Sequence, residues 1–257
     1  MIRFASALVL ASLFTILTPS VSPQSSLPAR DLWEKAIEAK GGREQLYKVK
    51  ALRLWYNETT RNFLGIAIHR GLVTRLYVFP GKVWAWDDGL PAPFHLSVSW
   101  VDIDQDKRCT QYEGAVRPVC GPPRQGTSLP EGISQAQYLY LMESQWVKPQ
   151  PVDFHTDHVG RNKVDVVRTS FENKRIDYFL DRQKHLPVRI DVFYNNSQRA
   201  TLSVEFSNYV VVDGVQMPTR QKDARINFEI NPSYDSTIFD APPSIAAGPD
   251  AWKRPTH

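Results

Sequence analysis

The chain lacks the patterns that mark most catalytic and nucleic-acid-binding proteins. It contains no GxSxG nucleophile elbow, no HExxH zinc motif and no glycine-rich phosphate loop. Basic and acidic residues are interspersed, with a formal net charge of +4 and no basic block, which argues against a nucleic acid partner. We therefore expect neither enzymatic activity nor a cofactor. Carboxylates that meet across strands keep an unrecognised enzyme open as an alternative.

Long apolar runs are absent after the first twenty or so residues. Residues 1–25 combine Arg3, an apolar run from Phe4 to Leu17 and a small, polar end, which is the pattern of a secretory signal peptide. No later stretch approaches the roughly 18 apolar residues of a transmembrane helix. We expect a mature chain that is soluble and exported, without a transmembrane segment.

Cysteine is scarce, and export gives the 2 cysteines a structural meaning. In an oxidising compartment Cys109 and Cys120 form the one possible pair within the chain. A disulfide that closes so short a loop contributes about 3 kcal/mol. The alternative, a redox or metal pair, is disfavoured because the two residues do not stand in a CxxC spacing.

The apolar periodicity predicts an α+β protein dominated by antiparallel strands. Residues 28–49 read as two short helices separated by Gly41-Gly42, and residues 131–146 read as a third helical segment. Most of residues 51–104 and 151–239 alternate with a period of two. About ten strands would share one apolar face, with too few helices to cover it. Either a cavity remains inside the curved sheet, or side chains fill it.

Four segments resemble a known family. AIEAKGGREQLYKVKALRL, YFLDRQKHLPVRIDVFY, VDGVQMPTR and INPSYDSTIFDAPPS follow one another as in the LolA-like proteins, which are related to outer-membrane lipoprotein-sorting factors. The resemblance implies one domain over residues 30–240, a strongly curved antiparallel sheet in the form of an incomplete β-barrel with helices packed in its concave face. It also implies a cavity for acyl chains. Residues 241–257, rich in Pro and Ala, are expected to form a mobile tail.

Aromatic and aliphatic residues on the expected strands are candidates for the cavity wall. Trp84 and Trp86 share one strand face, and Trp100 ends the next strand. Core packing is the alternative, because large aromatics dominate protein cores. The candidate ligand-binding residues are Leu54, Tyr56, Trp84, Trp86, Val98, Trp100, Ile190, Val192, Val204, Phe206 and Phe228.

The stretch DIDQDKRCTQYE, residues 102–113, places acidic residues at ligand positions of an EF-hand calcium loop. Its sixth position is Lys107, where such a loop requires glycine, and its flanks do not read as helices. We interpret it as a strand that runs into a polar, disulfide-closed loop with a solvated acidic edge. His155 and His158 lie three apart in a strand and face opposite sides, so we expect no metal site there.

These observations favour a periplasmic protein that binds or carries a hydrophobic ligand without covalent chemistry. The expected partner is a lipid or an acylated protein, because burial of each methylene contributes about 0.8 kcal/mol. The alternative is a protein-interaction or signal-sensing module of the cell envelope, with a filled core and envelope proteins as partners.

Overall fold

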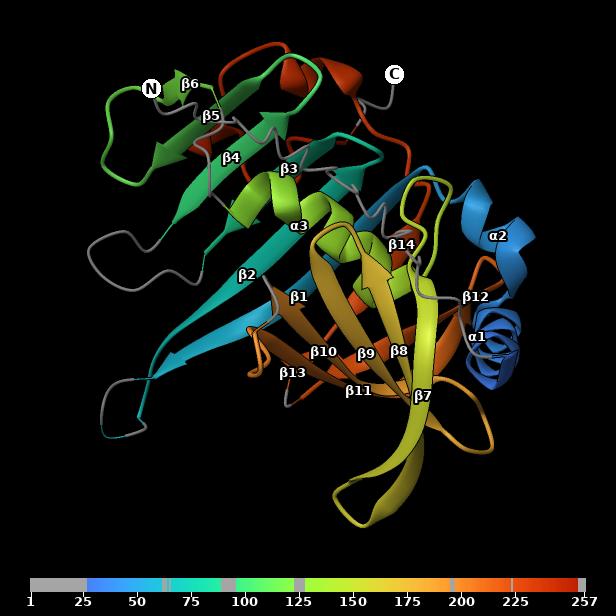
Figure 1. Ribbon diagram of the computed structural model, residues 1–257. Helices are drawn as coiled ribbons and strands as arrows, with labels where there is room; N and C mark the ends of the chain where they lie inside the picture. Colours follow the sequence, from blue (N-terminus) through green and yellow to red (C-terminus); the bar gives the residue numbers. More distant parts are fainter. Residues whose placement is uncertain are drawn as a thin grey trace, which may run out of the picture.

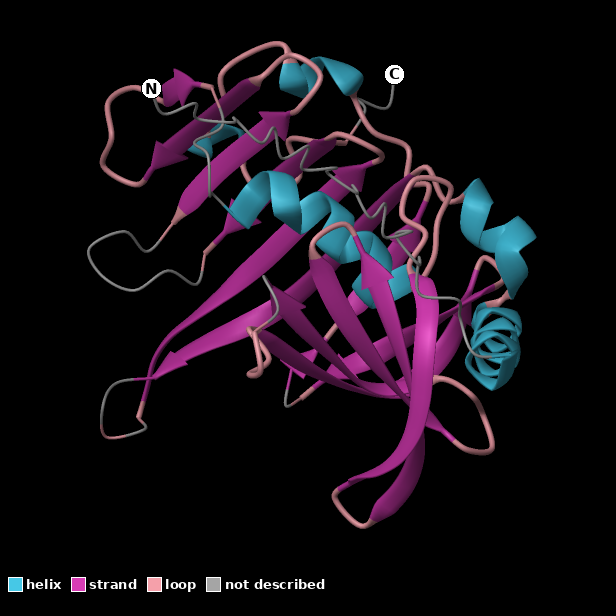
Figure 2. Cartoon of the chain, viewed as in Figure 1, coloured by secondary structure: helices cyan, strands magenta, loops and turns pink. Residues whose placement is uncertain are grey.

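The computed structural model describes residues 27–253, except residues 62–63, 65, 89–95, 123–127, 195–196 and 223. The expected signal peptide, residues 1–25, lies outside the described residues. Strands predominate, and helices are few and short (Figure 2). The α+β class expected from the sequence agrees with this architecture.

The described strands form two seven-stranded sheets with antiparallel pairing (Figure 1). In spatial order the first sheet contains β14 (Asn227–Ile230), β1 (Ala51–Arg61), β2 (Ala67–Val78), β3 (Lys82–Asp87), β4 (Ser97–Asp102), β5 (Lys107–Tyr112) and β6 (Val119–Gly121). The second contains β13 (Ala224–Arg225), β12 (Val215–Gln221), β11 (Leu202–Val212), β10 (Pro187–Tyr194), β9 (Lys174–Asp181), β8 (Asn162–Phe171) and β7 (Gln150–Val159).

The chain passes from one sheet to the other at Ile226, between β13 and β14. This residue is buried, and its N–H donates to the carbonyl of Thr219 at 3.0 Å. The opposite edges, β6 and β7, do not pair with each other in the described part of the chain, so no closed barrel forms. The sequence predicted one sheet of about ten strands, whereas the structure has two sheets of seven strands each. The short strands at the sheet edges were missed because they lack a strong alternation signal.

The helices follow the predicted segments closely. α1 (Leu27–Lys40) and α2 (Gly42–Lys48) are separated at Gly41, whose φ of 130° suits glycine. α3 (Ser128–Ala136) continues into the π-helical turn η1 (Gln137–Leu141), which ends at Met142 with a φ of 68°. α3 and η1 lie between the two sheets, whereas α1 packs across β7, β8 and β12 of the second sheet (Figure 1).

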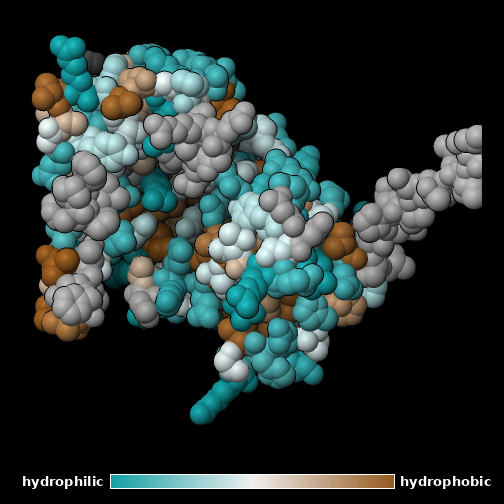
Figure 3. Space-filling model, turned by 60° about the vertical axis from the view of Figure 1, so that its left-hand side comes forward, coloured by the Kyte–Doolittle hydropathy of each residue, from teal (hydrophilic) through white to brown (hydrophobic). Residues whose placement is uncertain are grey.

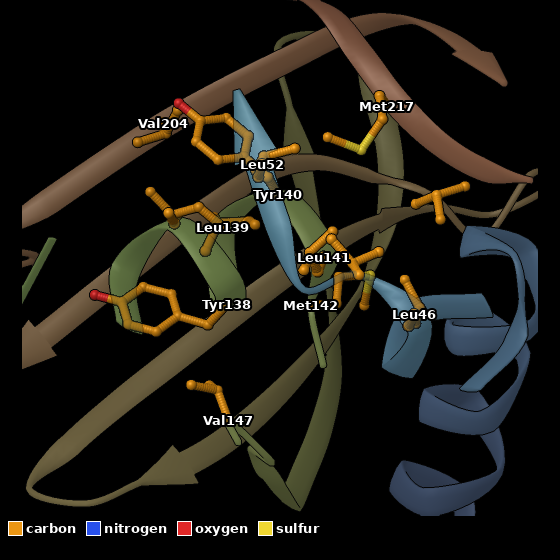
Figure 4. Packing of buried hydrophobic residues seen from close by; sticks show 14 of the residues in the cluster. Leu46, Leu52, Tyr138, Leu139, Tyr140, Leu141, Met142, Val147, Val204 and Met217 are labelled. Atoms are coloured by element: carbon orange, nitrogen blue, oxygen red, sulfur yellow. The ribbon is translucent and has the colours of Figure 1, made fainter. Parts of the chain in front are cut away.

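The main core gathers around η1, as Figure 4 shows. All five residues of this turn are buried, because the wide π-helical turn sends successive side chains toward both sheets. The Tyr140 ring lies 5.9 Å from Phe206 and 5.1 Å from Phe228, measured between ring centroids. On the other side, the hydroxyl of Tyr178 donates to the carbonyl of Tyr138 at 3.0 Å. The segment thus joins the inner faces of both sheets.

The C-terminal segment covers the outer face of the first sheet and includes two 3-10 turns, η2 (Ser236–Phe239) and η3 (Ile245–Ala247). Trp100 Nε1 donates to the carbonyl of Ala241 at 2.8 Å, and Trp252 is 2% exposed. The expected mobile tail, residues 241–257, is therefore packed as far as residue 253, because Trp252 buries its ring against the sheet. Residues 254–257 lie outside the described residues.

The acidic stretch that resembles a calcium loop forms the β4–β5 turn, and a disulfide joins Cys109 to Cys120 across β5 and β6. The disulfide was predicted correctly. Asp102 is wholly buried, bonds Lys82 Nζ at 2.6 Å and accepts the N–H groups of Asp104 and Gln105. The expected solvated edge was therefore wrong for Asp102, because this carboxylate holds the turn together.

A buried lysine ends α1. Lys40 is 1% exposed, its Nζ donates to the carbonyl of Gln216 in β12, and it lies 5.1 Å from the centroid of the Tyr209 ring. Desolvation lowers the pKa of Lys40 to about 7 from its ordinary value of 10.5. Between pH 7 and about 10.5, Lys40 is protonated in the unfolded chain and neutral in the folded chain. The free energy of unfolding contributed by Lys40 is therefore lowest below pH 7 and rises with pH up to about 10.5.

We predict that Lys40→Met removes this pH dependence. Urea unfolding between pH 6 and pH 10 should show the wild-type stability gaining on the variant by up to about 1.4 kcal/mol per pH unit above pH 7. Lys35→Met, at an exposed position of the same helix, is the control. A difference between wild type and Lys40→Met that stays constant with pH would contradict the lowered pKa.

Candidate ligand cavity between the two sheets

A cavity of about 880 Å³ lies between the two sheets. One wall comes from β1, β2 and β3, the second from β11, β12 and β13, and the third from α3 and η1. The space-filling view shows the molecule hollowed between its two halves, with brown, apolar side chains inside the hollow (Figure 3). The size falls within the range of about 300–1,000 Å³ that is typical of small-molecule sites.

The deeper lining is apolar. Leu54, Val83 and Val204 contribute aliphatic side chains from the two sheets, and Leu139 contributes one from η1. Figure 4 shows Leu139 and Tyr140 on the same segment as Leu141 and Met142, which are fully buried. The inserted segment thus presents part of its surface to the cavity and buries the rest in the core.

Small residues on α3 leave room for the cavity. Gly132 and Ala136 both line it, and a Cβ added to Gly132 would meet no heavy atom within 4 Å. A larger residue at either position would project into the empty volume. The inserted helix therefore contributes to the hollow through the small residues on one of its faces.

Polar groups surround part of the lining. Arg75 lies 3.8 Å from Asp87 between Nη2 and Oδ2, and its side chain is 38% exposed. Interaction with Tyr77 is the largest of the effects that raise the pKa of Arg75, so the guanidinium stays charged. Burial is the first cause that raises the pKa of the Glu58 carboxyl, followed by the nearby charge of Asp87. A ligand that spans this cavity would meet both aliphatic and charged surface.

A tyrosine links the inserted segment to the second sheet. The Tyr140 hydroxyl donates to Gln221 Oε1 at 3.0 Å, and both residues line the cavity. Burial raises the pKa of Tyr140 well above its ordinary value, so the hydroxyl remains a hydrogen-bond donor. The geometry of this lining suits binding by burial and hydrogen bonding.

The structure divides the eleven sequence-predicted site residues into three groups. Leu54, Tyr56 and Val204 line the cavity. Ile190, Val192, Phe206 and Phe228 belong to the same core and lie outside the cavity lining. Trp84, Trp86, Val98 and Trp100 lie on the opposite face of the first sheet, in the core beneath the C-terminal segment.

The sequence predicted the last four residues on the cavity wall, whereas the structure places them on the opposite face of the first sheet. β3 is buried on both faces, so its alternation does not reveal which face looks inward. The register pairs Trp84 with Trp100 on the outer face, whereas the neighbouring Val83 lines the cavity. Sequence reasoning also missed Arg75, although its pairing opposite Leu54 follows from the alternation of β1 and β2.

A second, smaller hollow of about 510 Å³ lies beside α1 and holds a buried carboxylate network. Glu143, 4% exposed, accepts from Arg43 Nε at 2.8 Å, from Trp33 Nε1 at 3.3 Å and from the Tyr47 hydroxyl. Arg43 also bonds Glu34, with 3.0 Å between Nη2 and Oε1. The network ties α1 and α2 to the chain directly after η1, and so fixes one end of the inserted segment.

Comparison with known proteins finds likeness in structure. No family model matches the chain, and no curated protein matches it. Among solved structures it is similar to a DUF1329 family protein from Desulfovibrio piger, with a TM-score of 0.45, 9% identity, and 82% of this chain and 97% of that chain covered. It is also similar to a domain described as an outer membrane lipoprotein-sorting protein from Vibrio parahaemolyticus, with a TM-score of 0.43, 8% identity, and 82% and 95% covered. The second of these has the lipoprotein-sorting description that the sequence resemblance led us to expect.

None of the helices in the described part of the chain is both long and apolar enough to cross a bilayer.

We predict that Arg43→Ala destabilises the protein by about 2 kcal/mol, because it leaves the buried Glu143 carboxylate without its guanidinium. Lys48→Ala is the matched control, since Lys48 and Glu44 form an exposed pair of neighbours on α2 whose loss should cost less than about 0.5 kcal/mol. Urea unfolding measures both changes. Equal losses in the two variants would show that the Glu143 network contributes no more than a surface ion pair.

Proposed function

We propose that the protein binds a hydrophobic ligand, a lipid or the acyl chain of a lipoprotein, in the cavity between its two sheets. The observation that carries the proposal is the 880 Å³ cavity with aliphatic side chains in its depth and charged groups in its lining. An acyl chain is flexible, apolar and attached to a polar group, so its two parts match the two kinds of lining. Burial of each methylene contributes about 0.8 kcal/mol, which makes one chain sufficient for useful affinity.

The binding involves no covalent chemistry, and the protein acts as a carrier or receptor in the periplasm. The disulfide between Cys109 and Cys120 supports an oxidising compartment, as does the leader-like sequence of residues 1–25. In this role the apolar chain is shielded from water by the two sheets while its polar end stays near the charged residues. The acyl chain would leave the cavity when it can enter another apolar environment.

A second candidate function is a protein-interaction module of the cell envelope. The observation that favours it is the filled part of the interior, where Tyr138, Leu141 and Met142 are fully buried between the sheets. A module of this kind would use its outer surface and leave the cavity occupied by water. The two candidates differ in whether the purified protein carries or accepts a lipid.

Native mass spectrometry of the protein purified from the periplasm tests the proposal directly. We expect an added mass that is lost on denaturation, with a stoichiometric lipid in the solvent extract, because a chain buried in the cavity dissociates slowly. A bare polypeptide mass that stays unchanged after fatty acids and phospholipids are added would support the interaction module instead.

We predict that Gly132→Trp weakens binding of a fluorescent long-chain fatty acid about tenfold or more, because the indole would occupy the open volume at this position. Gly132→Ala should keep the affinity and raise stability by about 0.5–1 kcal/mol, since alanine favours the helix. Gly121→Trp adds the same side chain in open space on β6 and serves as the second control. Unchanged fatty-acid affinity in Gly132→Trp would exclude the cavity as the binding site.

A further inference from the structure

The first sheet extends into an arm, formed by the end of β1 up to Arg61 and the start of β2 from Ala67, which projects away from the body of the protein (Figure 1). Near its end Leu64 is 66% exposed, Ile66 is 59% exposed and Ile68 is 62% exposed. These three large aliphatic residues fall within five positions, whereas the other exposed aliphatic residues of the described chain occur singly or in pairs. Figure 3 shows brown surface at the lower left, beside the hollow. So dense an apolar cluster at the end of an arm is typical of an interaction site.

The charge of the arm indicates the kind of partner. The sequence contains no Asp or Glu from Thr59 to Trp86, and Arg61 and Arg70 flank the apolar end. Arg70 is exposed in the structure. His69 of the arm contacts the carboxyl of Asp88, with 3.1 Å between Nε2 and Oδ1, and Glu58 directly precedes the arm on β1. Exposed aliphatic residues flanked by arginines are the combination that binds the surface of an anionic bilayer, where the aliphatic groups enter the acyl region and the guanidinium groups meet the phosphates.

The arm also forms part of the cavity wall. Tyr56, Asn57, Glu58 and Thr59 of β1 line the cavity, and the same strand continues into the arm. A bilayer held by the end of the arm would therefore lie near the opening of the cavity. The β1–β2 ladder pairs continuously from Ala51 opposite Val78 to Thr60 opposite His69, and one register shift precedes the last pair, Arg61 and Ala67. This ladder connects the cavity wall to the arm.

We propose that the end of the β1–β2 arm, with Leu64, Ile66 and Ile68 as its apolar contacts and arginines beside them, docks the protein on an anionic lipid bilayer. This role goes beyond ligand binding in the cavity and does not need an occupied cavity. Docking is peripheral and reversible, since only a few side chains enter the lipid.

The test is flotation of the purified protein with phosphatidylcholine vesicles that contain phosphatidylglycerol. We expect wild-type protein to float with these vesicles, with less binding at high salt because the phosphate contacts are screened. A variant with Leu64→Ser, Ile66→Ser and Ile68→Ser should bind these vesicles at least about tenfold more weakly than wild type. A variant with Val116→Ser and Val119→Ser removes exposed aliphatic residues from another part of the first sheet and should bind like wild type.

Thermal unfolding of each variant establishes that it is folded. Arg70→Glu provides a second test with a single substitution, and this variant should bind anionic vesicles less than wild type. The proposal is overturned if wild type ignores anionic vesicles, or if the arm variant and the Val116/Val119 variant lose binding equally. It is also overturned if the arm variant abolishes self-association or binding to another protein while vesicle binding persists. A protein that retains lipid in native mass spectrometry and ignores vesicles would keep the cavity function and exclude the docking arm.

Discussion

The structure depends on the packing of one inserted segment, α3 with η1, between two sheets whose inner faces are both apolar. Neither sheet can bury its inner face alone, because an apolar sheet face needs another layer packed against it. The π-helical turn solves this by turning Tyr138 toward Tyr178 of the second sheet while Tyr140 packs on Phe206 and Phe228. The free energy of burying these rings stabilises the arrangement of both sheets at once.

The cavity is a consequence of the same packing. Where the segment carries large side chains it fills the interior, and where it carries Gly132 and Ala136 it leaves a hollow. Two hydrogen bonds add to this packing at the C-terminal end of the segment: the Tyr140 hydroxyl donates to Gln221 on β12, and Arg43 of α2 donates to Glu143. Because the segment is fixed at several points, the hollow has a defined shape in the folded protein rather than collapsing.

The cavity and the β1–β2 arm share a strand, and this continuity gives the protein a coherent mode of action. Leu54 and residues 56–59 of β1 supply aliphatic and polar lining, and the strand continues from there into the arm with its exposed aliphatic residues. A lipid that leaves a bilayer at the arm would travel a short path to a site of similar polarity. In the two proposed roles, burial of apolar surface would drive binding at both places.

The sequence by itself determined the elements and the chemistry of their surfaces. The alternation of LPVRIDVFY and similar segments predicted strands, and Gly41-Gly42 predicted the break between helices. The disulfide was predicted because a chain expected to be exported has only two cysteines, Cys109 and Cys120. Tertiary structure alone decided which face of β3 looks inward, because both faces are apolar and Trp84 packs under the C-terminal segment. It also decided where the cavity lies, because an empty volume depends on how distant small residues such as Gly132 meet the sheets, and no local pattern encodes that distance.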